Sequence, residues 1–188
     1  MALLINLRAA IFRHGLTLAS APYLTSPIPT NCALLRREYK ESKVTTKIEL
    51  LAKLNALFDA DPDAPPVVTL DEYFSENDDE ESIAPNNWGF GRPSIKLIYQ
   101  HLQDIAARTD VQGVYVGLHD EWPESLDDDE LWPAAENIHI ITTAPQSEVE
   151  TWLEALEIDG VSAGWPYGEH KLSPKPQADY TLYTIFWD

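Results

Sequence analysis

Apolar side chains recur at helical intervals in three parts of the chain. In residues 46–58, 93–108 and 143–160 they fall three and four positions apart, which places them on one face of an α-helix. The pattern therefore predicts three amphipathic helices, each with one side packed against a core.

Two of these helices carry start signals, and one carries an end signal. Thr46 with Glu49, and Thr143 with Gln146, have the spacing of a capping box, in which each side chain satisfies a free backbone N–H of the first turn. Gly160 stands where a left-handed residue commonly ends a helix. We expect capping boxes at both starts and the end of the third helix at Gly160.

Four other segments have the apolar and β-branched composition of strands. They are residues 67–70, 111–120, 137–144 and 179–188, and residues 160–177 are rich enough in Gly and Pro to predict a connection. In chain order the elements are α, β, α, β, β, α and β. This order predicts an α+β domain with one mixed, mainly antiparallel sheet of about four strands and helices packed on it.

Charge divides the chain into two parts. Of 188 residues with a net charge of −18, the first 43 hold six of the 13 Lys and Arg but two of the 31 Asp and Glu. Residues 44–188 therefore hold seven basic and 29 acidic residues, a net charge of −22. We predict that 44–188 form a single acidic domain, which would repel nucleic acid and anionic lipid and attract a basic protein surface.

Residues 1–43 allow three interpretations. Their Arg-containing, acid-poor composition is that of a targeting segment, but Arg8 and Arg13 interrupt the apolar run that a secretory signal needs. They could instead form a structured N-terminal arm. The interpretation we favour is a non-native extension from a misassigned start, with Val44 read from a GTG codon.

Two acidic segments, residues 71–82 and 120–132, hold the densest runs of carboxylates and also contain aromatic side chains. Such runs usually form solvated surface, and they sometimes bind basic partners. Trp122 and Trp132 either anchor an interface, where tryptophan is enriched, or cover the ends of the sheet. The predicted partner-binding residues are Glu76, Asp78, Asp79, Glu80, Glu81, Glu121, Trp122, Glu124, Asp127, Asp128, Asp129, Glu130 and Trp132.

A second class of function would use histidine. His119 and His139 stand on predicted strands that could pair, with Asp120 beside the first, so a metal site or a general acid/base pair is an alternative. Their spacing is not that of a known ligand set. We therefore predict no metal site, no cofactor and no catalytic residue.

Two short motifs resemble known sites but lack the required context. Residues 160–164 match G-x-S-x-G, but a helix precedes them and Trp165-Pro166 follows, whereas a nucleophile elbow lies between a strand and a helix. The acidic run 75–82 lacks the glycine and the alternating carboxylates of a calcium loop. We interpret the first as a glycine turn and the second as acidic surface.

The stretch VVTLDEYFSENDDEESIAPN, residues 67–86, resembles a motif in an uncharacterised family of small acidic bacterial proteins. In that motif a strand leads through an aromatic pair into N-D-D and then S-I. Residues 108–120 and 137–144 are similar too, and the resemblance covers residues 46–166. It implies no catalytic residues, and Glu80 and Glu81 stand where a glycine would be expected after N-D-D.

Together these observations predict a cytoplasmic protein that binds and neutralises a basic partner. The most specific form of this hypothesis is an immunity protein that blocks a toxin such as a nuclease. The alternatives are a small enzyme or metal protein using His119 and His139, and an acidic protein with a housekeeping interaction role. The single cysteine, Cys32, fits a reducing compartment, and no apolar stretch approaches the roughly 20 residues of a membrane span.

Overall fold

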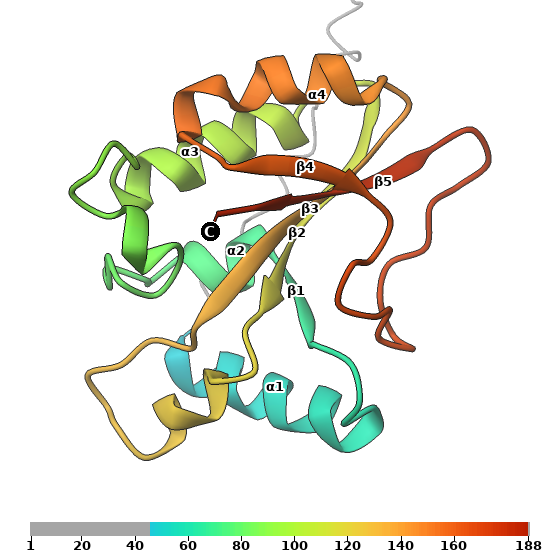
Figure 1. Ribbon diagram of the computed structural model, residues 1–188. Helices are drawn as coiled ribbons and strands as arrows, with labels where there is room; N and C mark the ends of the chain where they lie inside the picture. Colours follow the sequence, from blue (N-terminus) through green and yellow to red (C-terminus); the bar gives the residue numbers. More distant parts are fainter. Residues whose placement is uncertain (1–45, 188) are drawn as a thin grey trace, which may run out of the picture. The chain divides into compact units, whose positions relative to one another are not determined.

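The computed structural model describes residues 46–187 (Figure 1). The three interpretations of residues 1–43 fall outside the described range. Within it, no helix is both long and apolar enough to cross a membrane.

The domain is built on an antiparallel sheet of five strands in the order β1-β2-β3-β5-β4. The strands are β1 (Val67–Thr69), β2 (Val111–Leu118), β3 (Ala135–Thr142), β4 (Gly160–Ala163) and β5 (Thr181–Phe186). The predicted α+β fold is thus confirmed. The sheet has five strands rather than about four, because the predicted connection after residue 160 begins with β4 at the sheet edge.

Four α-helices accompany the sheet: α1 (Lys47–Ala60), α2 (Leu70–Phe74), α3 (Ile95–Ala106) and α4 (Gln146–Leu153). Short 3-10 turns occupy Pro85–Asn87, Trp122–Leu126 and Glu154–Leu156. α3 and α4 lie side by side over the sheet (Figure 1). Just past the end of α3, the guanidinium carbon of Arg108 lies 3.9 Å from the centre of the Trp152 ring on α4.

One of the two predicted capping boxes is present in the structure and the other is not. Thr46 accepts a 3.3 Å hydrogen bond from the Glu49 N–H, as predicted. The box predicted at Thr143 is wrong, because α4 begins after Pro145 and has no side-chain cap. The predicted end of that helix at Gly160 is wrong too. Glu157 takes the left-handed conformation (φ 51°), and Gly160 pairs with Phe186 in the sheet.

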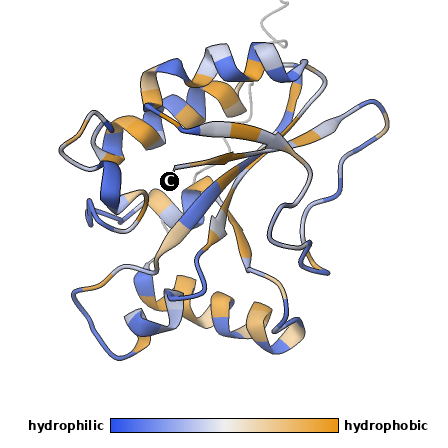
Figure 2. Ribbon diagram, in the orientation of Figure 1, coloured by the Kyte–Doolittle hydropathy of each residue, from blue (hydrophilic) through white to orange (hydrophobic). Residues whose placement is uncertain are grey.

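The two faces of the sheet have different coverings. One face presents Val68, Val116, Ile138 and Ile185, which join buried side chains of all four helices in a single core cluster. Figure 2 shows the corresponding alternation of apolar and polar residues along helices and strands. The other face carries a row that includes His139 and Thr184, and here the Trp165 ring lies 4.4 Å from the His139 ring.

Candidate functional site

The two acidic segments are distant in sequence but adjoin in the fold. Asp79 Oδ2 accepts a 3.1 Å hydrogen bond from the Trp132 N–H, and the Ser82 carbonyl accepts one of 2.8 Å from the Ala135 N–H. Ile83 and Ala135 form an isolated parallel bridge next to these contacts. Loop 75–82 is therefore fixed against the chain that leads into β3.

Tyr73 holds this junction together from inside. Its side chain is fully buried on α2, and its hydroxyl lies 2.8 Å from the Ser82 carbonyl and 3.0 Å from the Pro133 carbonyl. Burial raises the pKa of Tyr73 well above its ordinary value, so the hydroxyl keeps the proton that it donates. One side chain thus bridges the two acidic segments.

Replacing Tyr73 by phenylalanine is expected to lower the free energy of unfolding by about 2 kcal/mol, because buried carbonyls lose a donor without gaining solvent. Chemical denaturation measures the change. Tyr180→Phe is the matched control, because the Tyr180 hydroxyl has no hydrogen bond to residues 46–187, and it should change stability by less than about 0.5 kcal/mol. Equal effects of the two variants would contradict the bridging role.

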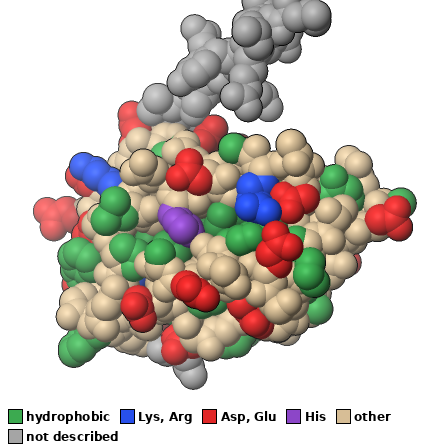
Figure 3. All heavy atoms as spheres, turned by 90° about the horizontal axis from the view of Figure 1, so that it is seen from above, with side chains coloured by type: hydrophobic (Ala, Val, Ile, Leu, Met, Phe, Trp, Pro, Cys, Tyr) green, Lys and Arg blue, Asp and Glu red, His purple; other side chains and the backbone are tan. Residues whose placement is uncertain are grey.

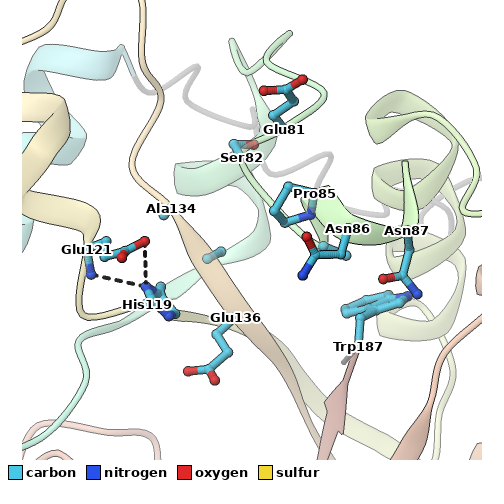
Figure 4. Close-up of a pocket in the computed structure, with 12 residues that line it drawn as sticks. Glu81, Ser82, Pro85, Asn86, Asn87, His119, Glu121, Ala134, Glu136 and Trp187 are labelled. Carbon is cyan, nitrogen blue, oxygen red and sulfur yellow. Dashed lines mark hydrogen bonds and ion pairs between the residues drawn. The ribbon is translucent and has the colours of Figure 1, made fainter. Parts of the chain in front are cut away.

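An open cavity of about 470 Å³ adjoins this junction. Figure 4 shows His119 and Glu121 on one side of it and Asn86, Asn87 and Trp187 on the other. Glu81 comes from the first acidic segment and Glu121 from the second, and the lining contains no Lys or Arg. The complete lining is Glu81, Ser82, Ala84, Pro85, Asn86, Asn87, His119, Glu121, Ala134, Ala135, Glu136 and Trp187.

His119 has a partner for either protonation state. Its Nδ1 lies 3.1 Å from the Glu121 N–H, which it accepts from when the ring is neutral. The same atom lies 3.0 Å from Asp120 Oδ1 and 3.6 Å from Glu121 Oε2, to which a protonated ring donates. The carboxylates of Glu121 and Glu136, which line the same cavity as this imidazole, favour cationic groups over anionic ones.

Two of the predicted partner-binding carboxylates act instead within the fold. Asp79 uses Oδ1 to accept from the Glu81 N–H at 2.9 Å and Oδ2 for the bond to Trp132. Glu80 pairs with Arg92 at 3.1 Å and accepts from the N–H of Ile95 at the start of α3. Both carboxylates have partners within the fold, and their binding to another protein stays a prediction.

Arg92 is a residue that the charge pattern did not single out. Its side chain is fully buried, donates to the Glu80 carbonyl at 2.6 Å and lies over the Trp88 ring at 4.7 Å. Burial lowers the pKa of Arg92, and Glu80 partly offsets this effect. The signal in the sequence was a lone arginine in a loop beside a strongly acidic run.

The remaining predicted carboxylates lie on the surface. Within residues 46–187, no Lys or Arg side chain forms a salt bridge with them. They can therefore meet the charges of a partner. These residues are Glu76, Asp78, Glu81, Glu121, Glu124, Asp127, Asp128, Asp129 and Glu130.

The two tryptophans of the second segment differ in their burial. Trp122 is only 3% exposed and packs edge-on against Phe58 at 6.3 Å, while Trp132 is half-buried against the core. The alternative, in which the indoles cover the sheet, describes Trp122. The exposed apolar groups of this segment are Leu126 (45%) and Leu131 (43%), which flank the run Asp127 to Glu130.

The alternative site using both histidines is not formed. His139 lies opposite Tyr115 within the sheet, whereas the His119 N–H bonds to the Ala134 carbonyl, five residues or roughly 16 Å further along the strand direction. No group of three or more His, Cys, Asp or Glu in the described chain is placed to hold a metal ion. Ser162, in the G-x-S-x-G match, lies on β4 opposite Thr184, so the segment is neither a nucleophile elbow nor the plain turn that was predicted.

Negative charge is not confined to the junction. Figure 3 shows acidic side chains dispersed over the face above α3 and α4, among Lys, Arg and apolar groups. α4 contributes the exposed Glu148 and Glu150, the first of which pairs with Arg108 at 3.1 Å. The junction is distinguished by the cavity at which both acidic segments meet, not by charge alone.

Comparison with known proteins finds a family but no function. Residues 45–185 match the model of a family described as "Uncharacterized protein YfbO family". Over 130 residues the chain is 32% identical to "Uncharacterized protein YfbO" of Escherichia coli (strain K12), which covers 68% of this chain and 86% of that relative. No solved structure matches the chain.

Proposed function

This chain belongs to the YfbO family of uncharacterised bacterial proteins, and from that premise we propose that it binds a basic protein through the cavity between its acidic segments. A lysine or arginine side chain of the partner enters the cavity, and the exposed carboxylates around it contact further basic groups. The observation that carries this proposal is that Glu81 and Glu121 line one cavity together with Glu136 and without Lys or Arg.

Electrostatics supports such a complex in two ways. The negative charges of the carboxylates raise the rate of encounter with a positive surface. The concave lining makes the contact selective for a protruding cation. The leucines at the ends of the run Asp127 to Glu130 add apolar contact at its margin. A partner of this kind binds less tightly as salt concentration rises.

The most specific form of the proposal is an immunity protein that neutralises a toxin. Nucleases carry basic surfaces because they bind phosphates, so a nuclease toxin has the charge that this cavity requires. By occupying those basic residues the protein would block access of nucleic acid.

The test compares two variants with the same loss of charge in different places. Glu81→Gln/Glu121→Gln/Glu136→Gln neutralises the cavity, and Glu150→Gln/Glu154→Gln/Glu157→Gln neutralises the region of α4. Each is immobilised and exposed to extract of the native bacterium, and captured proteins are identified by mass spectrometry and then titrated in purified form. We expect wild type to capture a basic protein whose affinity falls about tenfold in the cavity variant and stays near wild type in the α4 variant.

The salt series supplies the second readout. Affinity for the captured protein should fall steeply between low and physiological salt in wild type, and the fall should be shallower in the cavity variant. Capture that is equal in both variants, or an affinity that does not respond to salt, would show that the cavity carboxylates do not bind the partner.

A further inference from the structure

A second cavity lies next to the first, on the other side of His119 and Glu136, and has a different character. It has a volume of about 430 Å³ and is lined by residues from the end of α1, the loop that follows it, the β2 end and Tyr167. Its lining is Phe58, Pro62, Asp63, Ala64, Pro65, Pro66, His119, Asp120, Trp122, Glu136 and Tyr167. This size is that of a small-molecule site.

We propose that this second cavity binds an organic cation with an apolar body, such as an alkyl or aryl ammonium or a guanidinium. The two cavities share His119 and Glu136, but this proposal does not depend on the protein-binding function. The proposal is carried by the combination of aromatic rings, carboxylates and proline walls in one cavity.

The aromatic rings provide the apolar part of the site. Phe58 and Trp122 meet edge to face at 6.3 Å, and Tyr167 contributes a third ring to the same lining. Phe58 is 44% exposed and Tyr167 51% exposed, so both rings are accessible to a ligand. A cation placed against such rings is attracted by the negative charge of their faces.

The polar groups of the lining select the sign of the ligand's charge. Asp63, Asp120 and Glu136 supply carboxylates, and no Lys or Arg lines the cavity. Proline at positions 62, 65 and 66 removes three backbone N–H groups, which are the donors that an anion would need. The walls therefore disfavour anions and favour a positively charged group beside the rings.

The loop that forms one wall is held in place by its sequence. Pro65 and Pro66 fix the backbone that enters β1, and the Leu118 N–H bonds to the Pro66 carbonyl at 3.0 Å. This wall is pre-organised, so binding does not require the loop to become ordered first.

Titration of the full-length protein with phenethylammonium and with its neutral counterpart 2-phenylethanol tests the proposal by calorimetry. We expect saturable 1:1 binding of the cation and about tenfold weaker binding of the alcohol. Asp63→Asn and Tyr167→Leu should each weaken binding of the cation about fivefold, whereas Glu81→Gln, which changes only the first cavity, should leave it unchanged. NMR amide shifts should map to Asp63, Ala64, Asp120 and Tyr167.

A blocked Gly-Arg-Gly peptide distinguishes the source of the cation. If the peptide competes with phenethylammonium, the natural ligand is a basic side chain of a protein; if it does not, the ligand is a free amine. Absence of saturable binding, equal affinity for the alcohol, or shifts that map to another surface would overturn the proposal. Because the control Glu81→Gln leaves Glu136 of the shared wall in place, this result stands apart from the test of the protein partner.

Discussion

Replacing Trp122 by alanine is expected to lower the free energy of unfolding by about 3–5 kcal/mol. The side chain is 3% exposed, belongs to the core cluster and packs against Phe58. Its removal deletes a large buried apolar surface and leaves a void that the surrounding α1 and sheet residues fill only in part. Chemical denaturation measures the loss, with the same dependence of unfolding free energy on denaturant concentration in wild type and variant.

The control for this variant is Leu126→Ala, four positions further along the same turn. Leu126 is 45% exposed, so its truncation should cost less than about 1 kcal/mol. If Trp122→Ala were as mild as Leu126→Ala while binding to a basic partner were lost, the indole would be an interface anchor and its core position would be wrong.

The long periodic elements could be predicted because their pattern is local. α1 and α3 carry apolar residues at helical spacing over at least three turns, and β2, β3 and β5 are rich in β-branched residues. In each case propensity, pattern and burial agree. The sequence was therefore sufficient for the fold class.

The short elements depended on contacts that local sequence does not encode. β4 contains two small residues and a serine, and its strand conformation comes from pairing with β5. α2 has five residues, too few for a period, although Thr69 and Glu72 carry a capping box that could have revealed its start. Pairing with β5 therefore determines the conformation of β4, whereas the capping box in the sequence marks the start of α2.

The candidate site was predictable in its composition but not in its assembly. Runs of carboxylates identify exposed acidic surface, whereas the contact between the runs rests on one carboxylate, Asp79, and one buried hydroxyl, Tyr73. Nothing in the local pattern separates Asp79 from its exposed neighbour Asp78. The charged residues around Trp122 left two interpretations open, an interface anchor or a cover for the sheet, and its indole reaches a core partner on α1.

The stability of the domain is expected to fall as pH drops below about 6.5, with a large part of the fall due to His139. This imidazole is buried on β3, and burial lowers its pKa from 6.5 to about 3. Its Nδ1 lies 2.9 Å from Thr184 Oγ1, which itself donates to the Gly164 carbonyl. His139 Nδ1 therefore donates to Thr184, and the ring is neutral in the folded state.

The direction of this pH effect follows from proton binding by His139 in the folded and unfolded states. Below pH 6.5 the unfolded chain protonates His139, whereas the folded chain does so only near pH 3. The contribution of the neutral ring to stability is complete above pH 6.5 and is lost as pH falls toward 3, by about 1.4 kcal/mol per pH unit. Between pH 6.5 and pH 4 the loss approaches about 3 kcal/mol.

His139→Gln isolates this contribution from that of the carboxylates, which titrate in both proteins. The difference in unfolding free energy between wild type and variant should shrink as pH falls from 7 to 4, because the glutamine has no proton to bind. A direct readout does not depend on the stability of the variant: the C2–H resonance of His139 should stay at its neutral position down to pH 4. A midpoint near 6.5 would mean that water reaches the ring, because no acidic residue lines the small pocket around it and could raise the pKa of His139 instead. Trp165 and the loop it belongs to, which cover this face of the sheet, would then be open in solution.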